Sequence, residues 1–359
     1  MPHEDVLVTL GVDTHADVHV VVALDQLGRF LDALEIPTTR SGYRQLLAWA
    51  GEFGIIDQVG IEGTGSYGAG LTRFLRAEGI AVVEVNRPDR RVRRHKGTSD
   101  LVDAEAAARA VQSGRAAVEP KTYDGNVEML RVLRVTRRSA QKTVNQTGNQ
   151  LLAMIGSAPE DLREQFAGLT TLQKARMASR LRPGVEPDTV TTATKLALKK
   201  PAQRFLTARE EIREIDPHIA RLVKATAPAL LERPGVGPQT AAVLLVTAGD
   251  NPDRLKSEGA FAQLTGTAPL PASSGKVVRH RLNRGGDRQA NWALHMIAIT
   301  RCSHDDRTRA YVEKRTPDGK ADLDTLRRIK RYIAREIFKV LRDSLATPNH
   351  HRQELPEAA

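Results

Sequence analysis

The stretch Val6-Leu-Val-Thr-Leu-Gly-Val-Asp13 is a short apolar run that ends in a carboxylate. Its length and its β-branched residues predict a buried strand. Residues 18–24 form a second apolar run, and residues 29–36 form a third beyond a turn at Gln26-Leu-Gly28. Three strands with such short connections predict an antiparallel meander.

Helices and strands alternate after the meander. Ser41 is expected to cap a helix with Leu46, Leu47, Ala50 and Phe53 on one face. The next expected elements are a strand at 58–62, a helix at 67–77, a strand at 80–85 and a helix at 100–112, which Ser99 caps. The order β-β-β-α-β-α-β-α predicts an α/β domain with a mixed sheet, and the ribonuclease-H-like fold has this order.

The rest of the chain has a helical pattern. Pro183-Gly-Val-Glu-Pro187 divides the region from 125 to about 231 into two helical arms. A heptad-like stripe in the second arm fits either a coiled coil between chains or an ordinary amphipathic helix packed on its own protein; its members are Ile212, Ile215, Ile219 and Leu222. Further helices are expected at 239–247, 291–302, 306–314 and 323–345. We therefore expect an α/β catalytic domain at 1–120, an all-α linker or coiled-coil region at 121–228, a mainly helical C-terminal domain at 229–346 and a flexible tail at 347–359.

Charge is distributed unevenly along the 359 residues. Residues 1–85 contain 5 Lys/Arg and 12 Asp/Glu, a net charge of −7, whereas the whole chain carries +11. An acidic region that can hold metal ions is thus followed by a basic remainder that can hold phosphates. The single cysteine, Cys302, excludes an internal disulfide and a multi-cysteine zinc site, which indicates a reducing, cytoplasmic setting. No signal peptide and no apolar run long enough for a membrane helix is found.

Four carboxylates occupy positions that can converge. Asp13 and Glu62 end two predicted strands, and Asp100 and Asp103 share one face of a predicted helix. Any one of them alone is more often a turn residue or a first-turn helix charge. Together they predict a site for two Mg²⁺ ions, which activate the attacking oxygen and stabilise the leaving oxygen in phosphodiester chemistry. Six cations directly before Asp100 are either a solvated loop or, as we prefer from their position, contacts to the phosphate backbone; they are Arg87, Arg90, Arg91, Arg93, Arg94 and Lys96.

Several motifs resemble the DEDD transposases of the insertion sequence 110 family. The N-terminal ones are Gly11-Val-Asp-Thr-His-Ala-Asp17, Ile61-Glu-Gly-Thr-Gly-Ser-Tyr-Gly68 and Thr98-Ser-Asp-Leu-Val-Asp-Ala-Glu105. The C-terminal ones are Arg233-Pro-Gly-Val-Gly-Pro238, Leu264-Thr-Gly-Thr-Ala-Pro-Leu-Pro-Ala-Ser-Ser-Gly275 and Arg284-Gly-Gly-Asp-Arg-Gln-Ala-Asn-Trp-Ala-Leu294. Two independent motif sets occur in the family's order and span nearly the whole chain.

The resemblance implies more than the residues do. It implies an N-terminal domain similar to the junction resolvase RuvC, with Asp13, Glu62, Asp100 and Asp103 as its acidic tetrad. It implies a C-terminal serine that becomes covalently joined to DNA, matched here by Ser274, with the adjacent Ser273 as the alternative. It further implies donor and target DNA as substrates, a guide RNA encoded beside the gene, a homo-oligomer (dimer or tetramer) and a bacterial, nucleoid-associated protein.

The C-terminal region adds further expectations. A cluster of cations suits phosphate contacts; it comprises Lys276, Arg279, Arg281, Arg284 and Arg288, with His280 among them. A further basic helix carries Arg327, Arg328, Lys330, Arg331, Arg335 and Lys339. Pro234-Gly-Val-Gly-Pro238 before a helix is either a helix-hairpin-helix turn whose N–H groups bind phosphate or a plain Gly-Pro turn. Aromatic residues are only 4% of the chain, so base stacking is not the expected readout.

Three other functions fit parts of the sequence. A RuvC-like junction-resolving nuclease would hydrolyse DNA without a covalent intermediate. An actin-like or sugar-kinase phosphotransferase shares the fold, but we find no second Asp-Gly-Thr-like phosphate loop. A decayed, non-catalytic nucleic-acid-binding protein is disfavoured by the intact set of four carboxylates.

Overall fold

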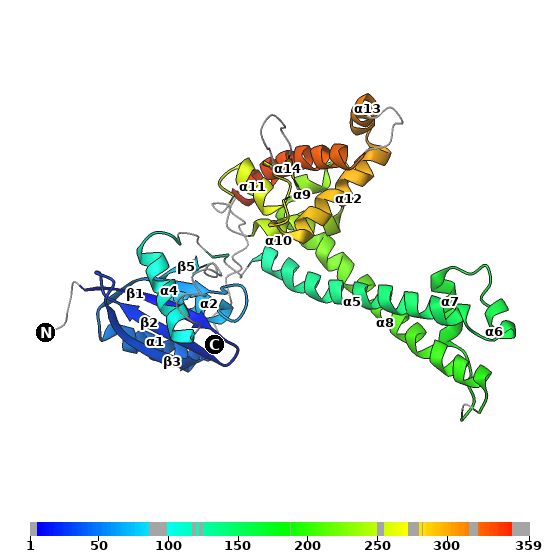
Figure 1. Cartoon of the computed structure of the whole chain (residues 1–359), viewed down its shortest axis with the longest axis horizontal. Helices are drawn as coiled ribbons and strands as arrows, with labels where there is room; N and C mark the ends of the chain where they lie inside the picture. Colours follow the sequence, from blue (N-terminus) through cyan, green and yellow to red (C-terminus); the bar gives the residue numbers. More distant parts are fainter. Residues whose placement is uncertain are drawn as a thin grey trace, which may run out of the picture. The chain divides into compact units, whose positions relative to one another are not determined.

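The computed structural model describes residues 6–85, 99–116, 120–121, 125–186, 188–249, 255–271, 280–281, 283–315 and 322–346 (Figure 1). The chain divides into two compact units. The first comprises Met1–Gly125 and Gly249–Lys256, and the second comprises Asn126–Ala248 and Ser257–Ala359.

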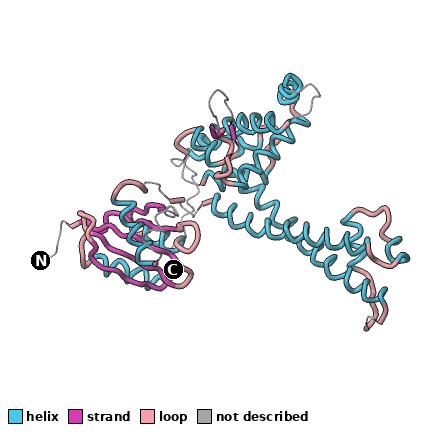
Figure 2. Tube along the Cα trace, in the orientation of Figure 1, coloured by secondary structure: helices cyan, strands magenta, loops and turns pink. Residues whose placement is uncertain are grey.

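A five-stranded mixed sheet forms the centre of the first unit. Its strands are β1 (Leu7–Thr14), β2 (Val18–Leu24), β3 (Phe30–Pro37), β4 (Ile55–Glu62) and β5 (Ala81–Val85). They lie in the order β3-β2-β1-β4-β5; β1, β2 and β3 pair antiparallel, and β4 and β5 add in parallel (Figure 2). The predicted meander and mixed sheet are therefore confirmed.

Helices cover both faces of this sheet. On one face, α1 (Arg40–Gly51) and α2 (Ala69–Ala77) bury side chains such as Leu46 and Leu71 against alternate residues of β1 and β4. On the other face lies α4 (Asp100–Gln112), whose alanines pack on β2 and β5. The predicted cap of the first helix was wrong: Thr39, not Ser41, is the N-cap, because its side chain accepts a hydrogen bond from the Gly42 N–H.

Two glycines let α4 approach the sheet closely. A Cβ atom at Gly11 of β1 would lie 2.1 Å from the Ala104 carbonyl oxygen, and one at Gly60 of β4 would lie 2.6 Å from Val111 Cγ2. Neither distance is compatible with a side chain, so only glycine allows the helix to lie directly on these strands. This contact sets the position of the first turn of α4.

Two long helices, α5 (Asn126–Gly156) and α8 (Val190–Thr226), lie side by side in the second unit (Figure 1). They share a core that includes Leu151, Phe166 and Phe205, to which the short helices α6 (Glu160–Glu164) and α7 (Thr171–Ser179) contribute. The predicted break at 183–187 falls between α7 and α8. In the heptad-like stripe, Ile219 and Leu222 are buried within this chain.

The rest of the second unit is a cluster of helices with one small hairpin. Its elements are α9 (Pro228–Leu231), α10 (Pro238–Ala248), α11 (Glu258–Leu264), β6 (Leu270–Pro271), β7 (His280–Arg281), α12 (Arg288–His304), α13 (Asp306–Arg315) and α14 (Leu323–Ala346). Contacts join α10 to α12 and α12 to α14, and Phe261 packs on Phe338 where α11 meets α14.

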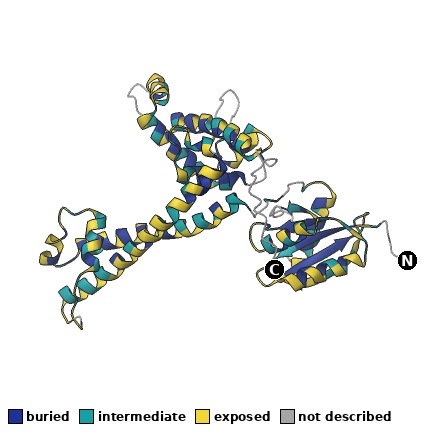
Figure 3. Cartoon of the chain, turned by 180° about the vertical axis from the view of Figure 1, so that it is seen from behind, coloured by how far each residue is buried: buried dark blue, intermediate teal, exposed yellow. Residues whose placement is uncertain are grey.

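Buried residues line the facing sides of these helices, as they line the sheet of the first unit (Figure 3). The predicted combination of a mixed α/β fold with a mainly helical remainder is confirmed, whereas α11 and the β6–β7 hairpin were not predicted. No helix in the described ranges is both long and apolar enough to cross a membrane.

Candidate functional site

Asp13 and Glu62 lie at the carboxyl ends of two neighbouring parallel strands. Val12 of β1 pairs with Ile61 of β4, so these two acids are the next residues along each strand. The Thr14 hydroxyl donates to the Glu62 carbonyl oxygen at 2.8 Å and joins the two strand ends. Val12 and Ile61 point into the core with α1 and α2. Because side chains alternate along a strand, both acids face the side of the sheet that α4 covers.

The first turn of α4 brings two more acids to this edge. Ser99 caps the helix by accepting from the Val102 N–H at 3.3 Å, and Asp100 and Asp103 lie in the first turn. Carboxylates are stabilised there because the helix N-terminus carries a partial positive charge. His15 Nε2 lies 3.2 Å from Asp13 Oδ2 and 3.4 Å from Asp100 Oδ2. The sheet edge and the helix thus meet around one histidine.

Asp13, His15 and Asp100 form a group that can hold a metal ion. One ligand atom from each residue lies within 4.8 Å of the others, in the part of the chain that the structure describes. Burial raises the pKa of Asp13 above its ordinary value; His15 opposes this shift, and the charges of Asp100 and Asp103 add to it. Carboxylates that repel one another in a half-buried site suit a divalent cation, and oxygen-rich donors are those that hard cations prefer.

Only two of the four predicted acids belong to the close group around His15. Asp13 and Asp100 share the close group, and Asp103 acts on Asp13 through its charge. Glu62 is 9% exposed and follows the residue paired with Val12, at the same sheet edge. His15 was not predicted as a site residue. It follows β1 directly, two residues beyond Asp13, and this spacing is the signal that would have found it, because residues i and i+2 of an extended chain share a face.

Many of the predicted basic residues lie outside the described residues, as do both serines. They are Arg87, Arg90, Arg91, Arg93, Arg94, Lys96, Ser273, Ser274, Lys276 and Arg279. Of the remainder, Arg281 belongs to β7, Arg284 is exposed before α12, and Arg288 is the first residue of α12.

The turn predicted as a helix-hairpin-helix element lies between two helices. The short helix α9 ends at Leu231 and α10 begins at Pro238. Gly235 between them has a φ of +73°, a conformation that L side chains rarely adopt, and the Gly237 N–H donates to the Thr240 hydroxyl at 3.1 Å. Phosphate binding by this turn stays a prediction.

Known proteins match both halves of the chain. A DEDD transposase model of the IS110 type matches residues 10–158, and a model described as transposase IS116/IS110/IS902 family matches residues 227–313. The chain is also similar to the insertion element IS110 uncharacterized 43.6 kDa protein of Streptomyces coelicolor, with 33% identity over 145 residues. That alignment covers 40% of this chain and 36% of the relative, so it spans about a third of the relative's length.

The two matched segments contain the two groups of residues that the sequence analysis predicted as site residues, the four acids and the two serines. The first contains β1, β4 and α4, which carry the four acids, and the second contains the α9–α10 turn and both serines. Over residues 10–158 and 227–313 the chain is therefore similar to the DEDD transposases of the IS110 family.

Proposed function

We propose that this protein is a DNA transposase that cuts and rejoins DNA to move an insertion sequence. The single observation that supports this most strongly is the convergence of Asp13, His15 and Asp100, with Asp103 close enough to raise the pKa of Asp13. This is an acidic centre of the kind that phosphodiester chemistry uses, in a chain of a transposase family.

Asp13 and Asp100 would hold the cation, with His15 completing the donor set and Asp103 and Glu62 contributing negative charge. We propose two Mg²⁺ ions as the bound metal, because oxygen-rich donor sets suit this cation; when bound, they would polarise the scissile phosphate. The protein's own contribution is placement: the Gly11 and Gly60 contacts fix α4 so that its first turn faces the strand ends.

The proposed nucleophile is Ser274, with Ser273 as the alternative. A serine hydroxyl is a weak nucleophile and needs activation. Its oxygen would form a bond to the phosphorus while the bond from phosphorus to the 3′-oxygen breaks. The serine proton would leave and the departing oxygen would gain one, which gives a phosphoserine–DNA ester and a free 3′-hydroxyl. Attack by a new 3′-hydroxyl would reverse these steps and rejoin the DNA without ATP.

The partners follow from the family. We propose donor and target DNA as substrates, a structured guide RNA encoded beside the gene, and a homo-oligomer in which subunits complete one another's sites. Phosphate contacts position a nucleic acid but do not specify its sequence. Base pairing by a guide would supply the specificity that a chain with 4% aromatic residues is not expected to obtain from stacking.

The test is to trap the covalent step. The full-length protein, expressed with its flanking non-coding DNA, would be incubated with donor and target duplexes and Mg²⁺, and a denaturing gel would show a protein–DNA adduct. We expect Asp13→Asn and Ser274→Ala to abolish the adduct, and Ser273→Ala to retain it. Asp17→Asn is the matched control, since Asp17 is an exposed acid just beyond the same strand. Cleaved DNA without an adduct, still dependent on Asp13, would instead assign a hydrolytic junction-resolving nuclease.

A further inference from the structure

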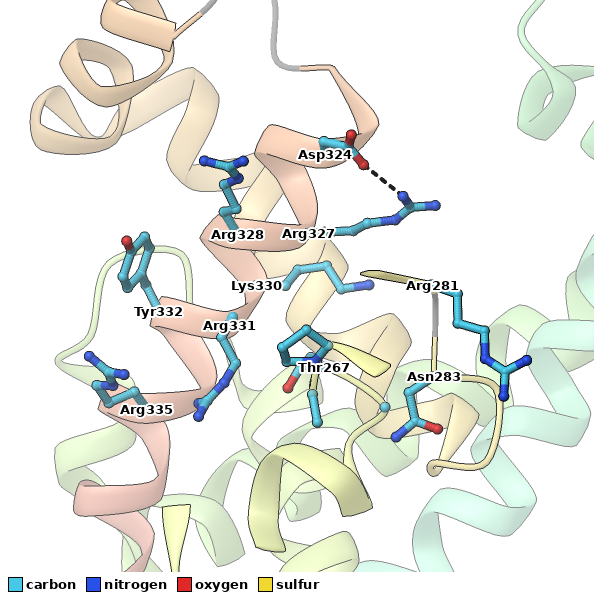
Figure 4. A pocket seen from close by; sticks show the side chains of 13 residues that line it. Thr267, Arg281, Asn283, Asp324, Arg327, Arg328, Lys330, Arg331, Tyr332 and Arg335 are labelled. Atoms are coloured by element: carbon cyan, nitrogen blue, oxygen red, sulfur yellow. Dashed lines mark hydrogen bonds and ion pairs between the residues drawn. The ribbon is translucent and has the colours of Figure 1, made fainter. Parts of the chain in front are cut away.

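A basic pocket of about 770 Å³ lies in the second unit, between α14 and the segment that leads into the β6–β7 hairpin (Figure 4). Its walls are the turn at 266–269, Arg281 of β7, Asn283 and one face of α14. The α14 residues that line it are Asp324, Arg327, Arg328, Lys330, Arg331, Tyr332 and Arg335. The lining thus contains six cationic side chains and one carboxylate.

Three of the six cations form ion pairs with carboxylates. Arg327 donates to Asp324 at 2.7 Å. Arg331 and Arg335 both contact the Glu258 carboxylate of α11, at 2.5 Å and 3.0 Å. Arg331 still keeps one buried nitrogen, Nη1, without a hydrogen-bond partner. The carboxylates therefore hold these arginines in place, and one donor of Arg331 stays without an acceptor.

The other three cations have no carboxylate within ion-pair distance in the described part of the chain. They are Arg281, Arg328 and Lys330. Arg281 and Arg328 are exposed, and Arg328 interacts with Asp322 only through longer-range charge. Lys330 is 8% exposed and donates to a neutral acceptor, Asn291 Oδ1, at 2.7 Å. Burial and the charge of Arg327 lower its pKa, as expected for an ammonium group that lacks a counter-charge.

The wall of the pocket is a built structure. Asn291 of α12 accepts from Lys330 and donates its amide N–H groups to the Thr265 and Gly266 carbonyl oxygens, at 2.9 Å and 3.1 Å. A Cβ atom at Gly286 would lie 2.2 Å from the Gly266 nitrogen, so the backbones meet there without side chains. This network joins α14, α12 and the turn before β6, and it fixes the cations relative to the hairpin.

We propose that this pocket binds the phosphodiester backbone of a nucleic-acid strand, with Arg281, Arg328 and Lys330 as its unneutralised cations. The proposal rests on the proposed function and deepens it, since it names residues that hold the substrate or the guide. Guanidinium groups match phosphate oxygens in fork geometry. Asp324 competes with phosphate for Arg327, and Glu258 competes for Arg331 and Arg335, so these carboxylates tune the affinity of the pocket.

The test measures binding without chemistry. The full-length protein, in a buffer with EDTA, would be titrated against fluorescent single-stranded DNA, single-stranded RNA and duplex DNA of one sequence at several salt concentrations. Arg328→Gln and Arg281→Gln should each weaken binding roughly threefold or more, and each should lower the salt slope by about 0.7 on single strands or about 0.9 on a duplex. Lys339→Gln is the matched control, because it removes one exposed charge from α14 outside the pocket lining.

A second variant tests the competitor role. Asp324→Asn removes the carboxylate that holds Arg327, and we expect tighter binding and a steeper salt slope. An effect that is larger on RNA than on DNA assigns the strand to RNA, and the reverse assigns it to DNA; either result supports the site.

Three results would contradict the proposal that this pocket binds a nucleic-acid backbone. The first is an unchanged salt slope for both arginine variants, and the second is an equal loss of affinity in Lys339→Gln. The third is an effect of the variants that appears only when polyglutamate is titrated as the polyanion in place of nucleic acid. If the wild-type protein binds no nucleic acid at all, the proposed function fails. If the wild type binds and still forms the adduct while the pocket variants behave as wild type, only the pocket assignment fails.

Discussion

The acidic edge of the sheet and the basic pocket on α14 carry opposite excess charge. At the sheet edge, acids from β1 and α4 lie close together with one histidine, and burial, together with the charges of Asp100 and Asp103, raises the pKa of Asp13. On α14, cations gather with two carboxylates that hold part of the set in place. Each cluster is short of the opposite charge. The acidic edge therefore suits a cation, and the basic pocket suits a polyanion, as proposed above.

The two clusters also differ in how they are held. Backbone packing at Gly11 and Gly60 holds the acidic edge, and side-chain hydrogen bonds through Asn291 hold the pocket. Variants that disrupt the glycine packing or the Asn291 hydrogen bonds, one at a time, can test whether the two clusters are held in these different ways. The expected effects fall from the first variant below to the last.

Gly11→Val should have the largest effect. A Cβ at this position meets the Ala104 carbonyl oxygen at 2.1 Å, so α4 must move away from β1. Overpacking of this kind costs about 3 kcal/mol of unfolding free energy. Urea denaturation would measure it, with Gly51→Ala as the control because a Cβ there meets nothing within 4 Å. A stability equal to wild type would show that α4 is not fixed by this contact.

Asn291→Ala should destabilise the second unit by about 2 kcal/mol. It leaves the buried Lys330 ammonium without its acceptor and two carbonyl oxygens without their donor. Asn145→Ala on α5 is the matched control, since that amide is exposed. Denaturation followed alongside the salt slope would separate the two roles. If both variants unfold alike, the network does not support the pocket.

Asp13→Asn should slightly stabilise the protein in metal-free buffer, whereas the two variants above destabilise it. The folded pKa of Asp13 is raised, so its protonated form favours the folded state; this contribution is fully present below the ordinary pKa of 3.8 and is lost as the pH rises through the folded pKa. At pH 7 the variant should therefore melt above the wild type, and the difference should vanish in acid. Added Mg²⁺ should stabilise only the wild type. A lower melting temperature at pH 7 in EDTA would contradict the electrostatic account.

Local sequence signals predicted most elements of the first unit. The apolar runs of β1 and β2, the Ser99 cap and the Asp100–Gln112 helix depend on neighbours a few residues apart, and the structure confirms them. Thr39 rather than Ser41 is the cap because α1 already begins at Arg40, and cap propensity does not choose between two hydroxyl residues so close in sequence. The α11 helix and the β6–β7 hairpin were missed because both are short, and a few residues carry little periodicity.

The sequence by itself determined the order of the strands and helices, the division into an acidic start and a basic remainder, and the four acids and their positions at strand and helix ends. Periodicity, capping and charge are properties of neighbouring residues, so the chain carries them in full. Only the tertiary structure decided that His15 lies between Asp13 and Asp100, and that Asn291 joins Lys330 to the turn at Thr265 and Gly266. Apart from the one between His15 and Asp13, these contacts join residues far apart in sequence, and the packing of α4 on two glycines and of α12 on α14 creates them.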